Sequence, residues 1–302
     1  MFSVLFFGTS EFAVPVLDAL KFFGFQIALV ITPPDKAKGR GRHIVFSPVK
    51  SYAVQHSLNS FQPRKLSAPD CVRYLTQYHF DIGIVASYGK IIPASILHVP
   101  THGMINIHPS LLPALRGPAP IQYALLFGLT VTGVTFMLMD EGMDTGPVLF
   151  QRTMRIPARA TFFMLSELLS RVAARDVPSV VTRYLTGELV SHAQGQNGVS
   201  YSKMLNKEAG QIRWENSAEK IDCMIRAFFP WPGAFTSWNG LHVKIIAAHP
   251  GSHGNLVIPC GDRTSLAIDT LQPAGKKSMS SSDFVRGYRR FLPSHAVLDR
   301  QR

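Results

Sequence analysis

Cysteine is scarce in this 302-residue sequence, with only Cys71, Cys223 and Cys260. These residues stand far apart, and no CxxC pair or Cys/His group has the spacing of metal ligands, so we expect no structural zinc and no metal cofactor. Such a low content also excludes a small disulfide-stapled fold. We therefore expect three reduced thiols, as is typical of a cytoplasmic protein.

Long apolar runs are absent as well. No stretch approaches the ~20 apolar residues that a helix needs to cross a bilayer. The first segment, Met1–Gly8, lacks the basic region and small-residue cleavage site of a secretory signal, and its pattern is typical of a buried strand. These absences favour a soluble cytoplasmic protein.

Acidic residues are few: 19 Asp and Glu stand against 31 Lys and Arg, which gives a net charge of +12. Such an excess favours a polyanionic partner, because clustered cations that neutralise phosphates release counterions. Residues 1–205 hold 18 basic and 11 acidic groups and residues 206–302 hold 13 and 8, so a polyanion is expected to contact both halves. The alternative is a basic surface that binds nothing, and charge alone does not choose between the two.

Two common phosphate-binding motifs are also missing. The first apolar run, 2–7, is not followed by GxGxxG, and GxxxxGK[ST] occurs nowhere in the chain. A Rossmann dinucleotide site and a P-loop are therefore not expected.

The pattern that is present alternates short apolar runs with helical periodicity over residues 1–189. Strands are expected at 2–7, 25–31, 82–86, 104–107, 132–138 and 148–155, and helices at 11–22 (capped by Ser10), 47–56, 69–78 and 162–185. Continuous apolar strands between helices predict an α/β fold with a Rossmann-like, mostly parallel sheet covered on both faces. Ligands of such sheets bind at the carboxyl ends of the strands.

The chain is long enough for two domains, and its character changes after residue 189. We interpret the polar Gly/Asn/Ser-rich segment 190–208 as a linker and residues 209–302 as a second domain. One helix is expected at 218–228, and short strands at 234–238, 242–247, 256–258 and 265–271. Asn239-Gly240 between two of them is a strong hairpin signal. This part therefore predicts a small C-terminal β-barrel of the OB type.

Asn106 and His108 stand at the end of the fourth expected strand, before Pro109. Residues i and i+2 of a strand project to the same face, so this amide and this imidazole point together at the carboxyl edge of the sheet. An amide N–H can stabilise an oxyanion, and a histidine can move protons near neutral pH. The pair suits acyl transfer, although a single Asn or His at a strand end is more often a turn residue.

An acidic, Gly-rich turn follows the strand at 132–138. A carboxylate in this turn could hydrogen-bond His108 and fix its tautomer. Asp140 and Asp144 are both candidates, and spacing does not decide between them.

The segment between the second strand and the next helix is unusually basic. Lys36, Lys38, Arg40 and Arg42 alternate with small residues in it. We interpret it as a flexible loop that contacts a phosphate backbone; the alternative is a solvated charge run.

Three motifs carry a resemblance to a known family over nearly the whole chain. They are Asn106-Ile-His108-Pro-Ser-Leu-Leu-Pro113, Arg116-Gly117-Pro-Ala-Pro-Ile-Gln122 and Met139-Asp140-Glu-Gly-Met-Asp144-Thr-Gly146. The chain resembles the 10-formyltetrahydrofolate-dependent formyltransferases. Further segments favour the branch that acts on methionyl-tRNA: Gly8–Val14, Gly39–Arg42, Ser47–Lys50, Phe229–Gly233 and Leu271–Lys277. It departs from the family pattern in the stretch 251–263, which is shorter than the pattern.

The resemblance implies a site and a reaction. Asn106, His108 and Asp144 would be catalytic, and Lys36, Lys38, Arg40 and Arg42 would bind tRNA. The implied folate-binding residues are Tyr88, Gly89, Ser110, Leu111, Leu112, Pro113, Asp140, Glu141 and Gly142. The co-substrate would be 10-formyltetrahydrofolate, without a metal. The acceptor would be the α-amino group of initiator methionyl-tRNA, for the initiation of protein synthesis by a cytoplasmic monomer.

Three alternatives stay open at this point. A sister enzyme would formylate a sugar-nucleotide or glycinamide amine, and a formyltetrahydrofolate hydrolase would use water as the acceptor. A catalytically silent RNA-binding protein on the same scaffold is the third, and the intact Asn/His/Asp set disfavours it.

Overall fold

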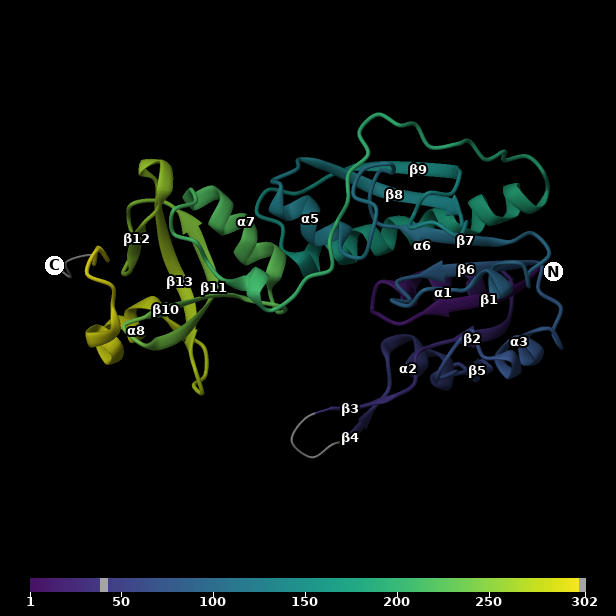
Figure 1. Cartoon of the computed structure of the whole chain (residues 1–302), viewed down its shortest axis with the longest axis horizontal. Coiled ribbons are helices and arrows are strands. Elements are labelled where there is room, and N and C mark those ends of the chain that lie inside the picture. The colour runs from purple at the N-terminus through teal and green to yellow at the C-terminus, as the bar shows by residue number, and fades with distance from the viewer. Residues whose placement is uncertain (39–42, 299–302) are drawn as a thin grey trace. The chain divides into compact units, whose positions relative to one another are not determined.

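The computed structural model describes residues 1–38 and 43–298 and divides into two compact units (Figure 1). The first unit contains Met1–Pro120, Val131–Arg155 and Ser166–Ser202, and the second contains Ile121–Thr130, Ile156–Leu165 and the chain from Lys203 onward. The domain limits expected from the sequence run continuously along the chain. These units, defined by packing, do not, because two short segments of the N-terminal half group with the second unit.

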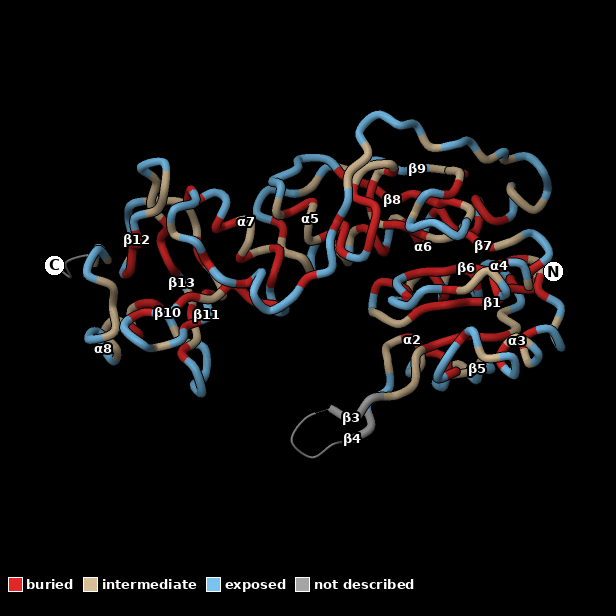
Figure 2. The backbone as a smooth tube through the Cα atoms, in the orientation of Figure 1, coloured by how far each residue is buried: buried red, intermediate tan, exposed pale blue. Residues whose placement is uncertain are grey.

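The first unit is built on a seven-stranded sheet in the order β5-β2-β1-β6-β7-β8-β9. Its strands are β1 (Ser3–Gly8), β2 (Gln26–Ile31), β5 (Ser60–Phe61), β6 (Ile82–Ala86), β7 (Met104–His108), β8 (Val131–Leu138) and β9 (Val148–Arg155). The strands from β5 to β7 are parallel, whereas β8 pairs antiparallel with both β7 and β9. All residues of β1 and β6 are buried (Figure 2). The prediction of a mostly parallel, doubly covered sheet is confirmed.

The helices described in this unit are α1 (Ala13–Phe22), α2 (Pro48–Gln55), α3 (Pro69–Leu75), α4 (Ala94–Leu97) and most of α6 (Phe162–Leu185). Helix α5 (Pro120–Leu126) groups with the second unit except for its first residue. Helix α2 is capped by Ser47, whose side chain accepts a hydrogen bond from the Lys50 N–H. The predicted cap of α1 is wrong. That helix begins two residues later than expected, and the Ser10 hydroxyl donates to Ser87, which is remote in sequence.

The basic segment also differs from the expected open loop. Strand β3 (Lys36–Lys38) pairs antiparallel with β4 (His43–Val45), so the two ends of the segment form a short hairpin. Arg40 and Arg42, which were predicted to bind tRNA, lie outside the described residues. Alternating charged and small residues did not indicate strand pairing, because the apolar signal of a buried strand is missing here.

The second unit contains an antiparallel sheet in the order β10-β11-β13-β12, with β14 paired to β13. Its strands are β10 (Ala234–Trp238), β11 (Leu241–Pro250), β12 (Val257–Pro259), β13 (Ser265–Pro273) and β14 (Met279–Ser280), and its helices are α7 (Ala218–Phe228) and α8 (Ser281–Tyr288). Asn239 and Gly240 have positive φ values of 46° and 84° and join β10 to β11, which confirms the predicted two-residue hairpin. The sheet curls as a half-barrel over a core of apolar residues that includes Ile221, Val243 and Phe284.

No helix within residues 1–38 and 43–298 combines the length and apolar character that crossing a membrane requires.

Candidate active site

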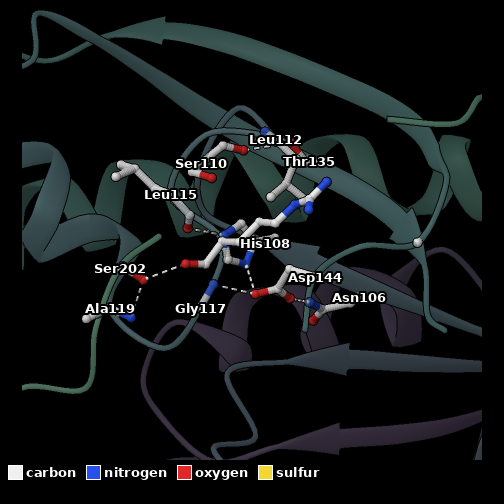
Figure 3. A network of polar contacts seen from close by, with 12 residues as sticks. Asn106, His108, Ser110, Leu112, Leu115, Gly117, Ala119, Thr135, Asp144 and Ser202 are labelled. Carbon is white, nitrogen blue, oxygen red and sulfur yellow. Dashed lines mark hydrogen bonds and ion pairs between the residues drawn. The ribbon is translucent and has the colours of Figure 1, made fainter. Parts of the chain in front are cut away.

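Asn106 and His108 lie at the carboxyl end of β7. The residues that alternate with them, Ile105 and Ile107, are 0% and 1% exposed and belong to the core. Because side chains alternate along a strand, Asn106 and His108 project to the other side, and both contact the same carboxylate there (Figure 3). The geometry expected from the i and i+2 spacing is therefore present.

That carboxylate belongs to Asp144, in the turn between β8 and β9. Its Oδ1 accepts a hydrogen bond of 3.1 Å from Asn106 Nδ2, and its Oδ2 accepts one of 2.7 Å from the Gly117 N–H. His108 Nδ1 lies 3.6 Å from Oδ2. Hydrogen bonds to a charged group contribute about 1.5–3 kcal/mol each, so these donors stabilise the carboxylate where it is partly removed from water.

The structure distinguishes Asp144 from Asp140, which spacing left equivalent. Asp140 is exposed, and its carboxylate accepts hydrogen bonds from the Gly142 N–H and the Thr145 hydroxyl within its own turn. Asp140 therefore stabilises the turn, whereas Asp144 faces His108.

The surroundings of His108 set the orientation of its ring. The residue is 4% exposed, and Nε2 lies 3.0 Å from the carbonyl oxygen of Leu115. A carbonyl oxygen only accepts hydrogen bonds, so Nε2 carries a hydrogen and Nδ1 is the atom that faces Asp144. At 3.6 Å this contact is longer than a good hydrogen bond, which leaves room for Nδ1 to interact with a bound group as well.

The residues predicted to border a folate lie in the three loops that follow β6, β7 and β8. The Ser110 hydroxyl is buried and donates to the Ala114 carbonyl, and the Leu112 N–H donates to Thr135, so both contacts stabilise the loop itself. Leu111 and Pro113 are half-buried. Asp140, Glu141 and Gly142 form an exposed turn next to Asp144.

Tyr88 and Gly89 lie at the end of β6. The Tyr88 ring is buried edge-on against Phe7, and its hydroxyl is a buried polar atom that makes no hydrogen bond within the described part of the chain. Burial raises the pKa of Tyr88 to about 12, so its phenol stays protonated at neutral pH. Gly89 is exposed and has a φ of 75°, a conformation that favours glycine.

Sequence reasoning missed the segment 192–202, which it treated as part of a linker. Gln194 hydrogen-bonds the backbone of the Asp144 turn, while Ser200 and Ser202 hydrogen-bond the loop that follows His108. Gly117 approaches this segment so closely that a Cβ on it would lie 2.4 Å from the Ser202 oxygen. The segment has no hydrophobic period, so its composition gave no signal of these contacts.

Within the described residues, no cluster of three or more His, Cys, Asp or Glu side chains is arranged to hold a metal ion.

Comparison with known proteins identifies the family. Residues 2–181 match the model of the formyl transferase domain, and residues 204–289 match the formyl transferase C-terminal domain. This chain belongs to the formyl transferase family. It is therefore an enzyme that transfers a one-carbon group.

Two relatives and one solved structure illustrate the similarity. The chain is 38% identical to the methionyl-tRNA formyltransferase of Geobacter metallireducens over 95% of its length and 96% of the relative's. It is 40% identical to that of Thermodesulfovibrio yellowstonii over 94% and 95%. An N-formyltransferase from Helicobacter canadensis, crystallised with folinic acid and dTDP-3-aminofucose, superposes with a TM-score of 0.69 at 18% identity, over 90% of this chain and all of that one. At that identity the structural match shows a shared fold.

Proposed function

We propose that this formyl transferase moves the formyl group of 10-formyltetrahydrofolate to the α-amino group of initiator methionyl-tRNA. The observation that carries the chemistry is the Asp144 carboxylate held between Asn106 and His108 at the end of β7. The choice of acceptor is supported by relatives named methionyl-tRNA formyltransferase that align with almost the whole chain, C-terminal domain included.

The reaction is a direct acyl transfer between two bound substrates. The free α-amine of the methionyl ester attacks the formyl carbon and forms a C–N bond, and the carbonyl oxygen takes up negative charge in a tetrahedral intermediate. Collapse of the intermediate breaks the bond between the formyl carbon and N10 of the folate. The amine loses one proton and N10 gains one, so the reaction needs no external acid, base or oxidant.

Asn106 is proposed to stabilise the oxyanion. Its amide has two N–H donors, and one of them is bound to Asp144 Oδ1. The second is available for the developing negative charge. A preorganised donor of this kind is typically worth about 10²–10³-fold in rate.

His108 and Asp144 are proposed to act together. The Leu115 carbonyl holds the hydrogen of Nε2, and the Asp144 carboxylate stabilises a positive charge on the ring. A protonated Nδ1 can then be shared between Asp144 and the substrate oxygen. Asp144 is partly exposed to solvent and can remove the amine proton, directly or through water.

We further propose that the folate lies against the three loops that surround the trio. The residues involved are Tyr88, Gly89, Ser110, Leu111, Leu112, Pro113, Asp140, Glu141 and Gly142. The support for this proposal is their position. They follow the neighbouring strands β6, β7 and β8, of which β7 carries Asn106 and His108 and the turn after β8 carries Asp144. The Helicobacter canadensis protein was crystallised with folinic acid, itself a formylated folate, which supports a folate donor for this fold.

The tRNA is proposed to contact both halves of the chain, which are both basic. The hairpin at Lys36–Val45 would contact the acceptor end, and the C-terminal domain would bind the acceptor arm through phosphate contacts. The reaction belongs in the cytoplasm, where charged tRNA is used, and one copy of the chain carries the whole trio and can act as a monomer.

The acceptor is tested by offering the purified protein 10-formyltetrahydrofolate with charged initiator tRNA, charged elongator tRNA or no acceptor. Formyl incorporation and formate release are followed together. We expect incorporation into initiator methionyl-tRNA in preference to the elongator. Formate release that ignores tRNA would instead identify a hydrolase. Transfer only to an added sugar-nucleotide or glycinamide amine would identify a sister transferase.

The basic hairpin provides a second test. Replacing Lys36, Lys38, Arg40 and Arg42 by glutamine is expected to raise the KM for tRNA and to flatten its dependence on salt, because fewer phosphate contacts release fewer counterions. The KM for the folate is expected to stay unchanged. Initial rates over a range of salt concentrations measure all three quantities.

The control removes the same charge elsewhere in the catalytic domain. Lys21, Arg64, Lys65 and Arg73 are exposed on α1, on α3 and in the loop before α3, and they are replaced by glutamine together. If both quadruple variants change the KM for tRNA and its salt dependence equally, or if neither does, the hairpin has no specific role.

A further inference from the structure

Gln194 connects the two loops that hold the Asp144 carboxylate. Its Nε2 donates hydrogen bonds of 2.8 Å to the carbonyl oxygens of both Asp144 and Gly146. Its Oε1 accepts from Arg116 Nη2 at 2.7 Å and from Arg116 Nε at 3.1 Å. One side chain therefore satisfies two backbone carbonyls on one loop and a guanidinium on the other.

The amide of Gln194 can lie only one way round. Arg116 has only donors and the two carbonyls only accept, so the oxygen must face the guanidinium and the nitrogen must face the turn. Arg116 is 8% exposed, and its positive charge polarises the amide, which makes the two N–H groups stronger donors. The Asp144 turn is thus linked through the Gln194 amide to the charged Arg116 guanidinium.

The turn needs this support because of its backbone. Asp144 has a φ of 53°, in the left-handed region that non-glycine residues adopt at a cost of order 1–3 kcal/mol. A Cβ on Gly146, two residues further on, would lie 1.9 Å from the Leu138 carbonyl oxygen, so the turn also packs tightly against the end of β8. Two hydrogen bonds from Gln194 to this short segment offset its strain and restrict the direction of the Asp144 side chain.

The other side of Asp144 is held by the same segment of chain. The N–H of Gly117 donates to Asp144 Oδ2, and the preceding residue, Arg116, is bound to the segment through its backbone. The Arg116 carbonyl oxygen accepts from the Ser202 N–H at 2.7 Å, and the Arg116 N–H donates to the Ser200 carbonyl oxygen at 2.9 Å. Residues 194–202 therefore position both the backbone that carries the carboxylate and the donor that binds it.

We infer that Gln194 is a positioning residue for the formyl transfer, which acts by holding Asp144 at its distance from His108 and Asn106. Gln194 does not contact any of the three side chains that carry the proposed chemistry. Its effect is expected in turnover and not in the binding of either substrate. The inference rests on the proposed function of the trio, but not on the identity of the acceptor.

The decisive variant is Gln194→Glu. A glutamate keeps the length of the side chain and still accepts hydrogen bonds from Arg116, so the segment that contains residue 194 stays linked to the loop that contains Arg116. It replaces two N–H donors by an oxygen that faces two carbonyl oxygens, so the Asp144 turn is released. Misplacement of a reacting group by about 1 Å can cost on the order of 10²-fold, and we expect kcat to fall by about 10- to 100-fold. The KM values for folate and acceptor are expected to stay within about twofold, as for loss of an interaction made only in the transition state.

Two comparisons separate positioning from simple stabilisation. Gln196→Glu makes the same substitution at an exposed residue of the same segment and is expected to keep wild-type kcat and thermal midpoint. Gln194→Glu added to Asp144→Asn is expected to lower kcat little further, because Gln194 acts through Asp144 and coupled residues are not additive. A full additional loss in the double variant, or a wild-type kcat for Gln194→Glu, would overturn the inference.

Measurements on the wild-type protein separate a failure of the Gln194 inference from a failure of the proposed function. If the wild-type protein formylates an amine other than that of methionyl-tRNA, or only releases formate, the proposed acceptor is wrong and the same variants are compared with that acceptor. The ratio of variant to wild-type turnover then tests Gln194 whichever acceptor is used.

Discussion

Asp144→Asn is expected to lower kcat by about a hundredfold or more, while Asp140→Asn is expected to keep most of the turnover. Asparagine has the shape of aspartate but only one acceptor oxygen, so it can accept from the Gly117 N–H or from Asn106, not from both. What is lost is the negative charge that faces His108 Nδ1 and the base that takes up the amine proton. Steady-state and single-turnover rates with saturating tRNA and folate measure the chemical step.

Asp140→Asn is the matched variant because it lies in the same turn and undergoes the same change of charge. Its carboxylate binds Thr145 and the Gly142 N–H, so we expect its effect in the KM for folate. A reversal, with turnover lost in Asp140→Asn and kept in Asp144→Asn, would transfer the catalytic role to Asp140 and remove the mechanism proposed here.

Asn106→Ala and His108→Ala are each expected to lower kcat by about a hundredfold or more with the fold intact. Asn106→Ala removes an oxyanion donor, and His108→Ala removes the ring that bears positive charge beside Asp144. The effects are expected to be less than multiplicative in the double variant, because the two side chains act on one intermediate. Rapid-quench formyl transfer and far-UV circular dichroism measure the rate and the fold in parallel.

His108 needs a separate control because its side chain is buried. Its removal leaves the Leu115 carbonyl without a donor, and an unsatisfied buried acceptor costs about 1–3 kcal/mol. His108→Gln retains a donor of similar reach and is expected to recover thermal stability but not turnover. Near-wild-type rates from folded Asn106→Ala and His108→Ala proteins would remove both residues from the mechanism.

The elements that were predicted most accurately are those with a strong local pattern. Strands β6 and β9 and helices α6 and α7 begin and end where the sequence places them. Strand β6 is continuously apolar, and helix α7 combines a helical apolar period with a clear boundary, the Ser217 side chain that caps it. The Asn239-Gly240 hairpin was also predictable, because a two-residue turn with positive φ values depends on those two residues alone.

The errors occur where a partner distant in sequence competes with the local pattern. Ser10 has the composition of a helix cap, yet its hydroxyl binds Ser87, which a parallel β1–β6 pairing brings beside it. The Lys36–Val45 hairpin has no apolar alternation to indicate it. The polar segment that contains Gln194 resembled a linker because its contribution is made through hydrogen bonds rather than buried apolar surface.

The sequence by itself determined that Asn106 and His108 share one side of β7, because alternation along a strand is a local property. It also determined the family, through motifs that need no structure to be read. Spacing left Asp140 and Asp144 open and the family resemblance implied Asp144, but only the tertiary structure decided how that carboxylate reaches the pair. The hydrogen bonds that hold Asp144 come from Gly117, Asn106 and Gln194, which are 27, 38 and 50 positions away in the chain. Such contacts depend on how separate loops meet at the end of a sheet, and no local spacing encodes that.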